Sequence, residues 1–277
     1  MITRVCISIN NACNLRCKYC HFHEKSDHIV SAPMDVFKIL DNIKHHIQKH
    51  NIKVFKVGFV GNGEPLLSYD ALKRYVEYIS DELLSGTISA YTITNGIFLT
   101  EEMLLFFKKY NVNVGFSIDG IKEIHDKWRC GSFDKVINSI ELYKKINGQY
   151  PSMNCTVGAD VIVKTAETIS FFRQFQNKIT FSRMIGNHGI SMLEFQKFME
   201  AAKSELNVRT GGYDCTMYGG LCGAGINNLF YANGGIYVCG NCIDMGNGLP
   251  YETPLDEVNF NIPSFNRNGC YKEVFYK

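Results

Sequence analysis

Apolar and polar positions follow two alternating patterns along residues 1–185. Short apolar runs rich in β-branched residues predict strands, and the stretches between them carry apolar residues at helical spacing. The predicted strands are Thr3–Ile9, Lys53–Val60, Ser89–Thr94, Val112–Ile118, Asn154–Ile162 and Ile179–Met184. The predicted helices are Met34–His50, Tyr69–Leu84, Glu101–Tyr110, Phe133–Ile146 and Ala166–Gln174. Strands that alternate with helices of this length favour βαβ units and a parallel sheet.

Six such units are too few for a closed eight-unit barrel, which takes about 250 residues. We therefore expect an α/β fold with an open, partial (β/α)6 barrel over residues 1–205. The alternation stops near residue 206, so residues 206–277 are predicted to form a small second domain. Ser68, Thr100 and Ser132 are the expected N-caps of three helices.

Composition argues against nucleic-acid binding, a membrane span and a disulfide framework. A net charge of +2 gives no electrostatic footprint for nucleic acid. No apolar run of 18 residues and no signal-peptide pattern occur, so we expect a cytoplasmic protein that does not span a membrane. Eleven cysteines in such a chain indicate metal binding or catalysis rather than disulfides. Cys6 and Cys155 lack partners at ligand spacing and are expected to fill the core, whereas Cys130 lies in a loop.

Three cysteines stand together just after the first predicted strand. Cys13, Cys17 and Cys20 have the spacing C-x3-C-x2-C. A [4Fe–4S] cluster usually takes four thiolates, so three leave one iron open, and an open position favours catalysis. The alternative is a zinc site formed by the same thiols with His21 or His23.

This loop resembles the signature of the radical S-adenosylmethionine superfamily, C-x3-C-x-φ-C, with Tyr19 as the aromatic residue φ. The resemblance implies a partial (β/α)6 barrel and a [4Fe–4S] cluster whose open iron binds S-adenosylmethionine. It also implies reductive cleavage of that cosubstrate to a 5′-deoxyadenosyl radical, which abstracts hydrogen from the substrate. The Tyr19 ring would lie against the adenine.

Further segments at predicted strand ends fit the same resemblance. Gly61, Asn62, Gly63 and Glu64 resemble the family's "GGE" element, whose backbone receives the amino group of S-adenosylmethionine. Asn95 follows the third strand as a further cofactor contact. By resemblance, Ser117 and Asp119 face the ribose and methionine portion. Arg129 either binds the cosubstrate carboxylate or forms a surface ion pair with Asp126.

Five further cysteines lie in the last part of the chain, at positions Cys215, Cys222, Cys239, Cys242 and Cys270. Cys222-x11-Gly234-x4-Cys239 resembles the opening of SPASM and twitch extensions, which carry auxiliary clusters. Ile236–Val238 would be one arm of a hairpin with its turn at Asn233–Gly235. The further cysteine block of a full SPASM domain is absent, so we expect one auxiliary [4Fe–4S] cluster in a twitch-like domain.

The resemblance selects Cys222, Cys239 and Cys270 as ligands of that cluster, with Cys215 as the fourth. Cys242 would then be a spare thiol that donates a hydrogen atom to a substrate radical. The alternatives are that Cys242 completes the cluster itself, or that these cysteines hold a structural zinc.

The run Ser117–Arg129 looks like the matching segment of peptide-modifying members, including anaerobic sulfatase maturases. The expected substrate is therefore a peptide or protein residue, modified by crosslinking, oxidation or epimerisation, with flavodoxin or ferredoxin as electron donor. Only twelve residues precede Cys13, so either a separate protein binds a leader peptide, or the substrate is short or recognised by the mouth of the barrel itself. The alternatives are a dehydrogenase of a small sugar or aminocyclitol, and a non-catalytic metal-binding protein. Asp160, Asp214, His188 and Arg183 are unranked candidates for a general base.

Overall fold

A single sheet runs through the computed structural model, which describes residues 1–20, 34–81, 86–208, 223–245 and 248–260. Within these residues the strand order is β6-β5-β4-β3-β2-β1-β7-β8-β9. The strands are β1 (Arg4–Ile7), β2 (Phe55–Phe59), β3 (Ile88–Thr94), β4 (Asn113–Ser117), β5 (Ser152–Val157), β6 (Ile179–Arg183), β7 (Asn228–Ala232), β8 (Gly235–Tyr237) and β9 (Leu249–Pro250). The first six pair in parallel, as the sequence predicts, and β6 and β9 are the outer strands of an open sheet.

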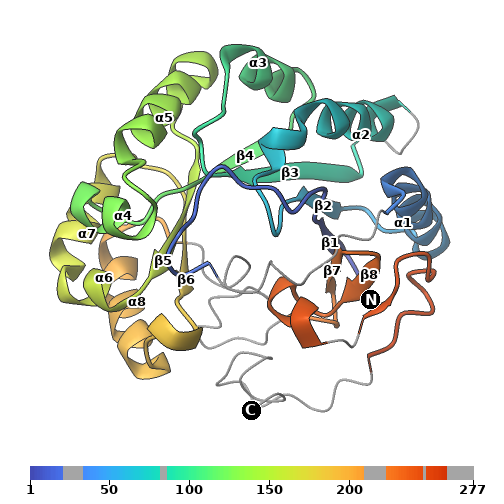
Figure 1. Ribbon diagram of the computed structural model, residues 1–277. Helices are drawn as coiled ribbons and strands as arrows, with labels where there is room; N and C mark the ends of the chain where they lie inside the picture. The colour runs from blue at the N-terminus through green and yellow to red at the C-terminus, as the bar shows by residue number, and fades with distance from the viewer. Residues whose placement is uncertain (21–33, 82–85, 209–222, 246–247, 261–277) are drawn as a thin grey trace.

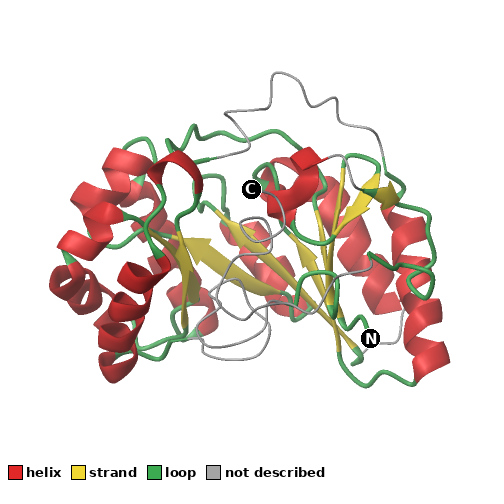
Figure 2. Cartoon of the chain, turned by 90° about the horizontal axis from the view of Figure 1, so that it is seen from below, coloured by secondary structure: helices red, strands yellow, loops and turns green. Residues whose placement is uncertain are grey.

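Helices cover the outer face of the curved sheet (Figures 1 and 2). They are α1 (Val36–His50), α2 (Tyr69–Asp81), α3 (Glu101–Lys109), α4 (Lys122–Trp128), α5 (Phe133–Asn147), α6 (Ala159–Val163), α7 (Thr165–Arg173) and α8 (Met192–Glu205). Short 3₁₀ turns are η2 (Pro65–Ser68), η3 (Gly186–His188) and η4 (Gly240–Met245). No helix in the described part of the chain has the length and apolar character needed to cross a membrane.

Helix α1 shows how the sequence sets its own boundaries. The Asp35 side chain accepts hydrogen bonds from the backbone N–H groups of Phe37 and Lys38, which caps the first turn. Asn51 ends the helix in the left-handed conformation, with a φ of 51°. The face between these caps buries an apolar stripe made of Val36, Ile39, Leu40, Ile43 and Ile47. The C-terminal half of α1 is thereby fixed against the start of the sheet.

The end of the fifth strand and two of the predicted helix caps differ from the structure. The fifth strand ends at Val157, and the β-branched run from Val161 lies in α6, because Gly158 turns the chain out of the sheet. Thr100 caps α3 through a hydrogen bond from the Met103 N–H, as predicted. Ser132 stands at the N-cap of α5 but makes no capping bond, and Ser68 ends η2 where it runs into α2.

Two cysteines fill the core, as predicted: Cys6 and Cys155 are buried, while Cys130 is exposed. The Cys6 Sγ lies 3.2 Å from the hydroxyl of Tyr91, which stands on β3. These two cysteines therefore serve packing, which leaves the clustered cysteines for chemistry.

The chain beyond residue 205 adds to the same sheet. Strand β7 pairs in parallel with β1, with Arg4 opposite Asn228, and β8 returns antiparallel to β7. The two turn residues, Asn233 and Gly234, have φ angles of 49° and 79°, which suits a tight hairpin turn. The predicted hairpin is thus confirmed. Because β7 lies beside β1, the loops that follow these two strands reach the same edge of the sheet (Figure 1).

Candidate active site

Five loops meet at the edge where the parallel strands end. They follow β1 to β5 and contain most of the side chains that the sequence singled out. In Figure 1 the loop after β1 crosses this edge from β1 toward α4. Ligand sites in parallel α/β sheets lie at the carboxyl ends of the strands.

The cysteine loop after β1 is held by backbone and side-chain contacts. Leu15 is buried, and the Lys18 N–H donates to the Trp128 carbonyl at the end of α4 at 2.9 Å. The Glu64 N–H donates to the carbonyl of Ala12 at 2.8 Å. The Cys20 N–H donates to the Cys17 carbonyl at 3.0 Å, which closes the C-x2-C turn. The loop is therefore fastened to both β2 and α4 without its thiols taking part.

The spacing of the three thiols differs from that of a single-ion site. One tetrahedral zinc ion, with bonds of about 2.3 Å, holds its sulfur ligands about 4 Å apart. In the described part of the chain, Cys13, Cys17 and Cys20 do not form a set whose ligand atoms all lie within 4.8 Å of one another. This spacing suits a cluster in which each thiolate binds its own iron. Burial raises the pKa of the Cys17 thiol to about 11, so cluster loading must displace its proton.

Tyr19 links the cysteine loop to the fourth strand and to α4. Its hydroxyl donates to Asp119 Oδ2 at 2.6 Å and accepts from Arg129 Nη1 at 2.6 Å. Burial, and after it the nearby Asp119, raises the pKa of Tyr19 well above its usual value. Burial opposes the charge of Arg129, but Tyr19 and Asp119 outweigh it and raise the pKa of that residue. The three side chains form one bridge beside Cys17.

Asp119 is fully committed to protein donors. Its Oδ1 accepts from the Thr156 N–H on β5 at 2.9 Å, and its Oδ2 accepts from Tyr19. Its own N–H donates to His125 Nδ1 at 3.2 Å. Asp119, which is 1% exposed, thus holds the loop after β4 in place.

His125 is a supporting residue that the sequence did not reveal. The Ser132 hydroxyl donates to the Arg129 carbonyl at 2.7 Å, so His125 Nε2, 2.9 Å from that hydroxyl, carries the hydrogen. Burial, and then the charge of Arg129, lowers the pKa of His125 to about 4. A neutral His125 therefore connects Asp119 to the Ser132 turn. Ser132 was expected to cap a helix, and it closes this turn instead.

Glu64 organises the ends of β2 and β3. Its Oε1 accepts from the Thr94 hydroxyl at 2.7 Å, and its Oε2 accepts from the Asn95 N–H at 2.7 Å. The Asn95 side chain donates to Asn14 Oδ1 at 2.7 Å, and its Nδ2 lies 3.9 Å from Cys13 Sγ. Burial raises the pKa of Glu64 even though these donors favour the carboxylate. Glu64 thus sets Asn95 against the cysteine loop.

The glycines of the loop after β2 allow its backbone to lie close to the cysteine loop. A Cβ at Gly63 would overlap Asn10 Oδ1 and the Ala12 carbonyl, and one at Gly61, where φ is 151°, would lie 2.6 Å from Ser8 Cβ. The Asn62 N–H donates to Ser8 Oγ at 3.2 Å. Larger residues at either glycine would push the loop after β2 away from the segment that follows β1.

Arg129 pairs with Asp119 rather than with Asp126. Its Nη1 lies 3.8 Å from Asp119 Oδ2, whereas Asp126 Oδ1 accepts from the Phe133 N–H at the start of α5. Arg129 is 8% exposed, and its buried Nε has no hydrogen-bond partner in the described part of the chain. A buried donor without a partner is costly, so this N–H is suited to an anionic ligand. Ser117 ends β4 on the same edge and is half-buried.

An asparagine bridge joins the cysteine loop to the C-terminal hairpin. Asn11 Nδ2 donates to Asn233 Oδ1 at 2.8 Å, across 222 residues of sequence. Asn62 Nδ2 donates to Asn11 Oδ1 at 3.4 Å. No local sequence pattern predicts this contact, which follows from the pairing of β7 with β1.

Two of the five C-terminal cysteines lie in the described residues. Cys239 and Cys242 are joined by a hydrogen bond from the Cys242 N–H to the Cys239 carbonyl at 3.0 Å, the same turn that joins Cys17 and Cys20. The Asn241 N–H points to Cys239 Sγ at 3.5 Å, a contact that favours thiolate, and Cys242 is buried. Cys215, Cys222 and Cys270 lie outside the described residues.

Comparison with known proteins agrees with this geometry. A cysteine-type anaerobic sulfatase-maturating enzyme of Clostridium novyi (strain NT) is 30% identical over 146 residues, or 50% of this chain and 39% of that protein. The chain thus spans about two fifths of the length of this curated relative.

Two solved structures share the fold. Native anSMEcpe with bound AdoMet superimposes with a TM-score of 0.74 at 19% identity, covering 92% of this chain and 79% of that one. SuiB of Streptococcus suis bound to precursor peptide SuiA gives a TM-score of 0.70 at 13% identity, over 92% and 64%. The sequence model of the radical SAM superfamily matches residues 7–202. The chain therefore belongs to the radical SAM superfamily, whose members use a [4Fe–4S] cluster and S-adenosylmethionine.

Proposed function

We propose that this chain cleaves S-adenosylmethionine reductively and abstracts hydrogen from a residue of a peptide or protein substrate. The observation that carries the proposal is the bridge from Tyr19 to Asp119 and Arg129 beside a held loop of three thiols. It combines a cluster-binding loop with a buried cation at the strand ends, where parallel sheets bind their ligands.

The residues present fit the proposed cofactors. Cys13, Cys17 and Cys20 would hold the cluster, since they share one fastened loop and their three sulfur atoms do not all lie within 4.8 Å of one another. The unpartnered Nε of Arg129 offers a charge-assisted hydrogen bond to the cosubstrate carboxylate. When bound, the cluster and cosubstrate together supply the radical that removes a hydrogen atom from the substrate.

Some of the other proposed cofactor residues would contact the cosubstrate, and others hold neighbouring residues in position. We assign the Gly61 and Gly63 backbone and the Ser117 side chain at this edge as cosubstrate contacts. The Asn62 N–H and the Asn95 side chain already donate to Ser8 and Asn14, so these two residues would contact the cosubstrate through their other atoms. Both Asp119 oxygens and both Glu64 oxygens accept hydrogen bonds from protein donors. We therefore assign Asp119 and Glu64 as positioning residues that hold Tyr19 and Asn95.

The names of two similar proteins support a peptide or protein substrate. The related Clostridium novyi protein matures sulfatases, according to its name, and SuiB binds a precursor peptide. Both likenesses cover only part of those proteins, so the substrate class is our inference for this chain. Crosslinking, oxidation and epimerisation are all reactions that begin with removal of a hydrogen atom from such a residue.

We also propose one auxiliary cluster in a twitch-like extension over residues 206–277. Cys239 is supported as a ligand by its N–H···S contact from Asn241. Cys242 shares its turn, which favours a ligand role for Cys242 over the role of hydrogen donor. With Cys242 as the fourth ligand, Cys222 and Cys270 complete the set of four thiolates, and Cys215 is the spare cysteine.

The function is tested by product analysis after anaerobic cluster reconstitution. Protein, S-adenosylmethionine and either dithionite or reduced flavodoxin are incubated with a library of short peptides, and 5′-deoxyadenosine and peptide masses are measured. We expect 5′-deoxyadenosine above the rate without substrate, together with a mass change in a peptide. Stimulation only by sugars or aminocyclitols would overturn the peptide assignment. No 5′-deoxyadenosine at all, with clusters intact, would overturn the enzyme assignment.

A further inference from the structure

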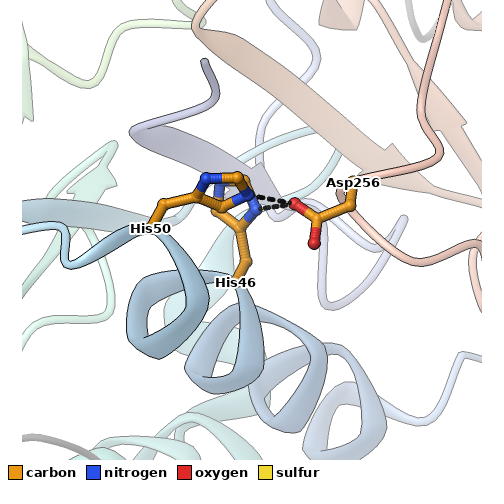
Figure 3. Close-up of side chains that lie close together, drawn as sticks. All are labelled: His46, His50 and Asp256. Atoms are coloured by element: carbon orange, nitrogen blue, oxygen red, sulfur yellow. Dashed lines mark hydrogen bonds and ion pairs between the residues drawn. The ribbon is translucent and has the colours of Figure 1, made fainter.

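A second group of metal-ligating side chains lies far from the cysteine loop in sequence and on another element. His46 and His50 stand one helical turn apart on α1, and Asp256 approaches them from the loop after β9 (Figure 3). His46 Nδ1 lies 2.6 Å and His50 Nε2 lies 2.7 Å from the same oxygen, Asp256 Oδ1. The three ligand atoms all lie within 4.8 Å of one another.

The hydrogen-bond pattern of His46 leaves a conflict that a cation would remove. His46 Nε2 lies 3.0 Å from the Ile2 carbonyl, which can only accept, so Nε2 carries the hydrogen. A neutral ring then presents the lone pair of Nδ1 to a carboxylate oxygen. A proton on Nδ1 or a metal cation between the two atoms would make this contact favourable. A cation between Nδ1 and Oδ1 satisfies both atoms and leaves the ring neutral.

The second contact of His46 is typical of a metal ligand. Ligating histidines usually donate their other ring N–H to a carboxylate or a backbone carbonyl, which fixes the tautomer and the ring orientation. Here the Ile2 carbonyl does this from the residues just before β1. Histidines at positions i and i+4 of a helix also present both rings on one face, as zinc-binding helices do.

The distances need only a small adjustment. Bonds of about 2.0–2.2 Å place the nitrogen and oxygen ligands of a tetrahedral zinc ion about 3.3 Å apart. The present separations of 2.6 and 2.7 Å must therefore open by less than about 1 Å. Asp256 can supply this movement because it lies in a loop and its side chain is 18% exposed. Its exposure also admits water as the fourth ligand.

We propose that His46, His50 and Asp256 bind one Zn²⁺ ion, which fastens the loop after β9 to α1. Two imidazoles and one carboxylate suit zinc, whereas calcium and magnesium prefer oxygen ligands alone. The loop already contacts α1 near this point, because Asn42 Nδ2 donates to the Thr253 carbonyl and Asn42 Oδ1 accepts from the Leu255 N–H. The ion adds a third link one turn further along the helix.

Lys49 separates this proposal from a plain ion-pair cluster. Its Nζ lies 2.8 Å from Asp256 Oδ2 and, as a cation, competes with a metal ion for the carboxylate. A metal site should therefore bind zinc equally well or more tightly without Lys49. If the residues form only an ion-pair cluster, removal of Lys49 would not raise the affinity for zinc.

The test uses tag-free protein with its clusters loaded anaerobically, titrated with Zn²⁺ against a competing chelator. We expect one zinc per chain beyond any bound by cysteines, with nitrogen and oxygen neighbours in its X-ray absorption spectrum. His50→Gln and Asp256→Asn should each weaken this binding at least ~100-fold, since loss of even a hydrogen-bond partner of a metal ligand costs about 10–100-fold. His45→Gln is the matched control, because His45 is an exposed histidine on the same helix outside the group.

Equal zinc binding in all four proteins, or a zinc shell of sulfur alone, overturns the proposal. Lys49→Ala should keep or raise the affinity, and a loss as large as that of His50→Gln also overturns it. Amide hydrogen exchange in residues 251–257 should slow on addition of zinc in the parent protein but not in His50→Gln. Exchange that does not respond in the parent contradicts the fastening role.

Discussion

Tyr19 and Asp119 are joined by a 2.6 Å hydrogen bond across 100 residues of sequence. The bond places the aromatic residue of the cysteine loop at the end of β4, and the same hydroxyl receives Arg129 from α4. The Tyr19 hydroxyl therefore couples the loop of three thiols to the buried guanidinium group of Arg129. This coupling explains how loops distant in sequence are kept in one arrangement.

The first prediction removes that hydroxyl. Tyr19→Phe keeps the ring but leaves Arg129 Nη1 and Asp119 Oδ2 without their common partner. We expect unchanged iron content, a loss of about 1–3 kcal/mol of folding stability and at least a tenfold weaker binding of S-adenosylmethionine. Equilibrium binding to the reconstituted protein measures the affinity.

Tyr75→Phe is the control, because the Tyr75 ring on α2 packs against Phe37 of α1 and Phe59 of β2. This variant should bind the cosubstrate normally. Unchanged affinity in Tyr19→Phe would show that the bridge does not shape the site.

The second prediction concerns the close approach at Gly63. Gly63→Ala places a methyl group onto Asn10 Oδ1 and the Ala12 carbonyl, just before Cys13. The loop must shift, so we expect less than half of the iron of the parent protein after reconstitution. Gly148→Ala is the control: its Cβ meets no atom within 4 Å, and its φ of 77° costs about 1–2 kcal/mol of stability. Full iron content in Gly63→Ala would contradict the role of this contact.

The third prediction follows from the buried His125. Its pKa is about 4 in the folded state and near 6.5 when unfolded, so the unfolded chain binds more protons between these values. Stability is therefore complete above pH 6.5 and falls as the pH drops toward 4. The contribution lost between about pH 7.5 and about pH 5 is about 2 kcal/mol.

Urea unfolding of the reduced, cluster-free protein measures this effect. His125→Gln removes the titration, so the stability gap between variant and parent should shrink by about 2 kcal/mol on going to the lower pH. The exposed His45 provides the comparison, and His45→Gln should leave the gap constant. A constant gap for His125→Gln would refute the neutral, buried state.

The fourth prediction separates the two roles of Cys242. If it is a ligand beside Cys239, Cys242→Ala should lower the iron content by up to about four atoms per chain and keep some cleavage of S-adenosylmethionine without product. Normal iron with lost product formation would instead establish the hydrogen-donor role. Normal iron with normal turnover would exclude both.

The sequence predicts the barrel well because strand and helix periodicity are local. The six parallel strands and the Asn233–Gly234 turn are confirmed for this reason. The pairing of β7 with β1 could not be predicted, since it joins residues more than 220 positions apart. The fifth strand is predicted to run on to Ile162 because Val161 and Ile162 are β-branched, but packing places both residues in α6.

The part of the site that depends on the spacing of residues in the sequence could be predicted. The part that depends on contacts between distant segments could not. Cys13, Cys17 and Cys20 are recognisable from their spacing alone. The commitment of both Asp119 oxygens to Tyr19 and Thr156 depends on three strands and loops meeting at one edge. The same holds for His125, whose position on α4 becomes meaningful only when the Asp119 N–H reaches it.

The central claim is that Cys13, Cys17 and Cys20 hold a cluster with an open iron that binds S-adenosylmethionine. The most direct measurement compares iron content and 5′-deoxyadenosine formation in the parent protein and in a variant with all three cysteines replaced by Ala, both reconstituted anaerobically and reduced with dithionite. We predict that the variant loses about four irons per chain and forms no 5′-deoxyadenosine. Unchanged iron, or continued formation of 5′-deoxyadenosine, would contradict the account.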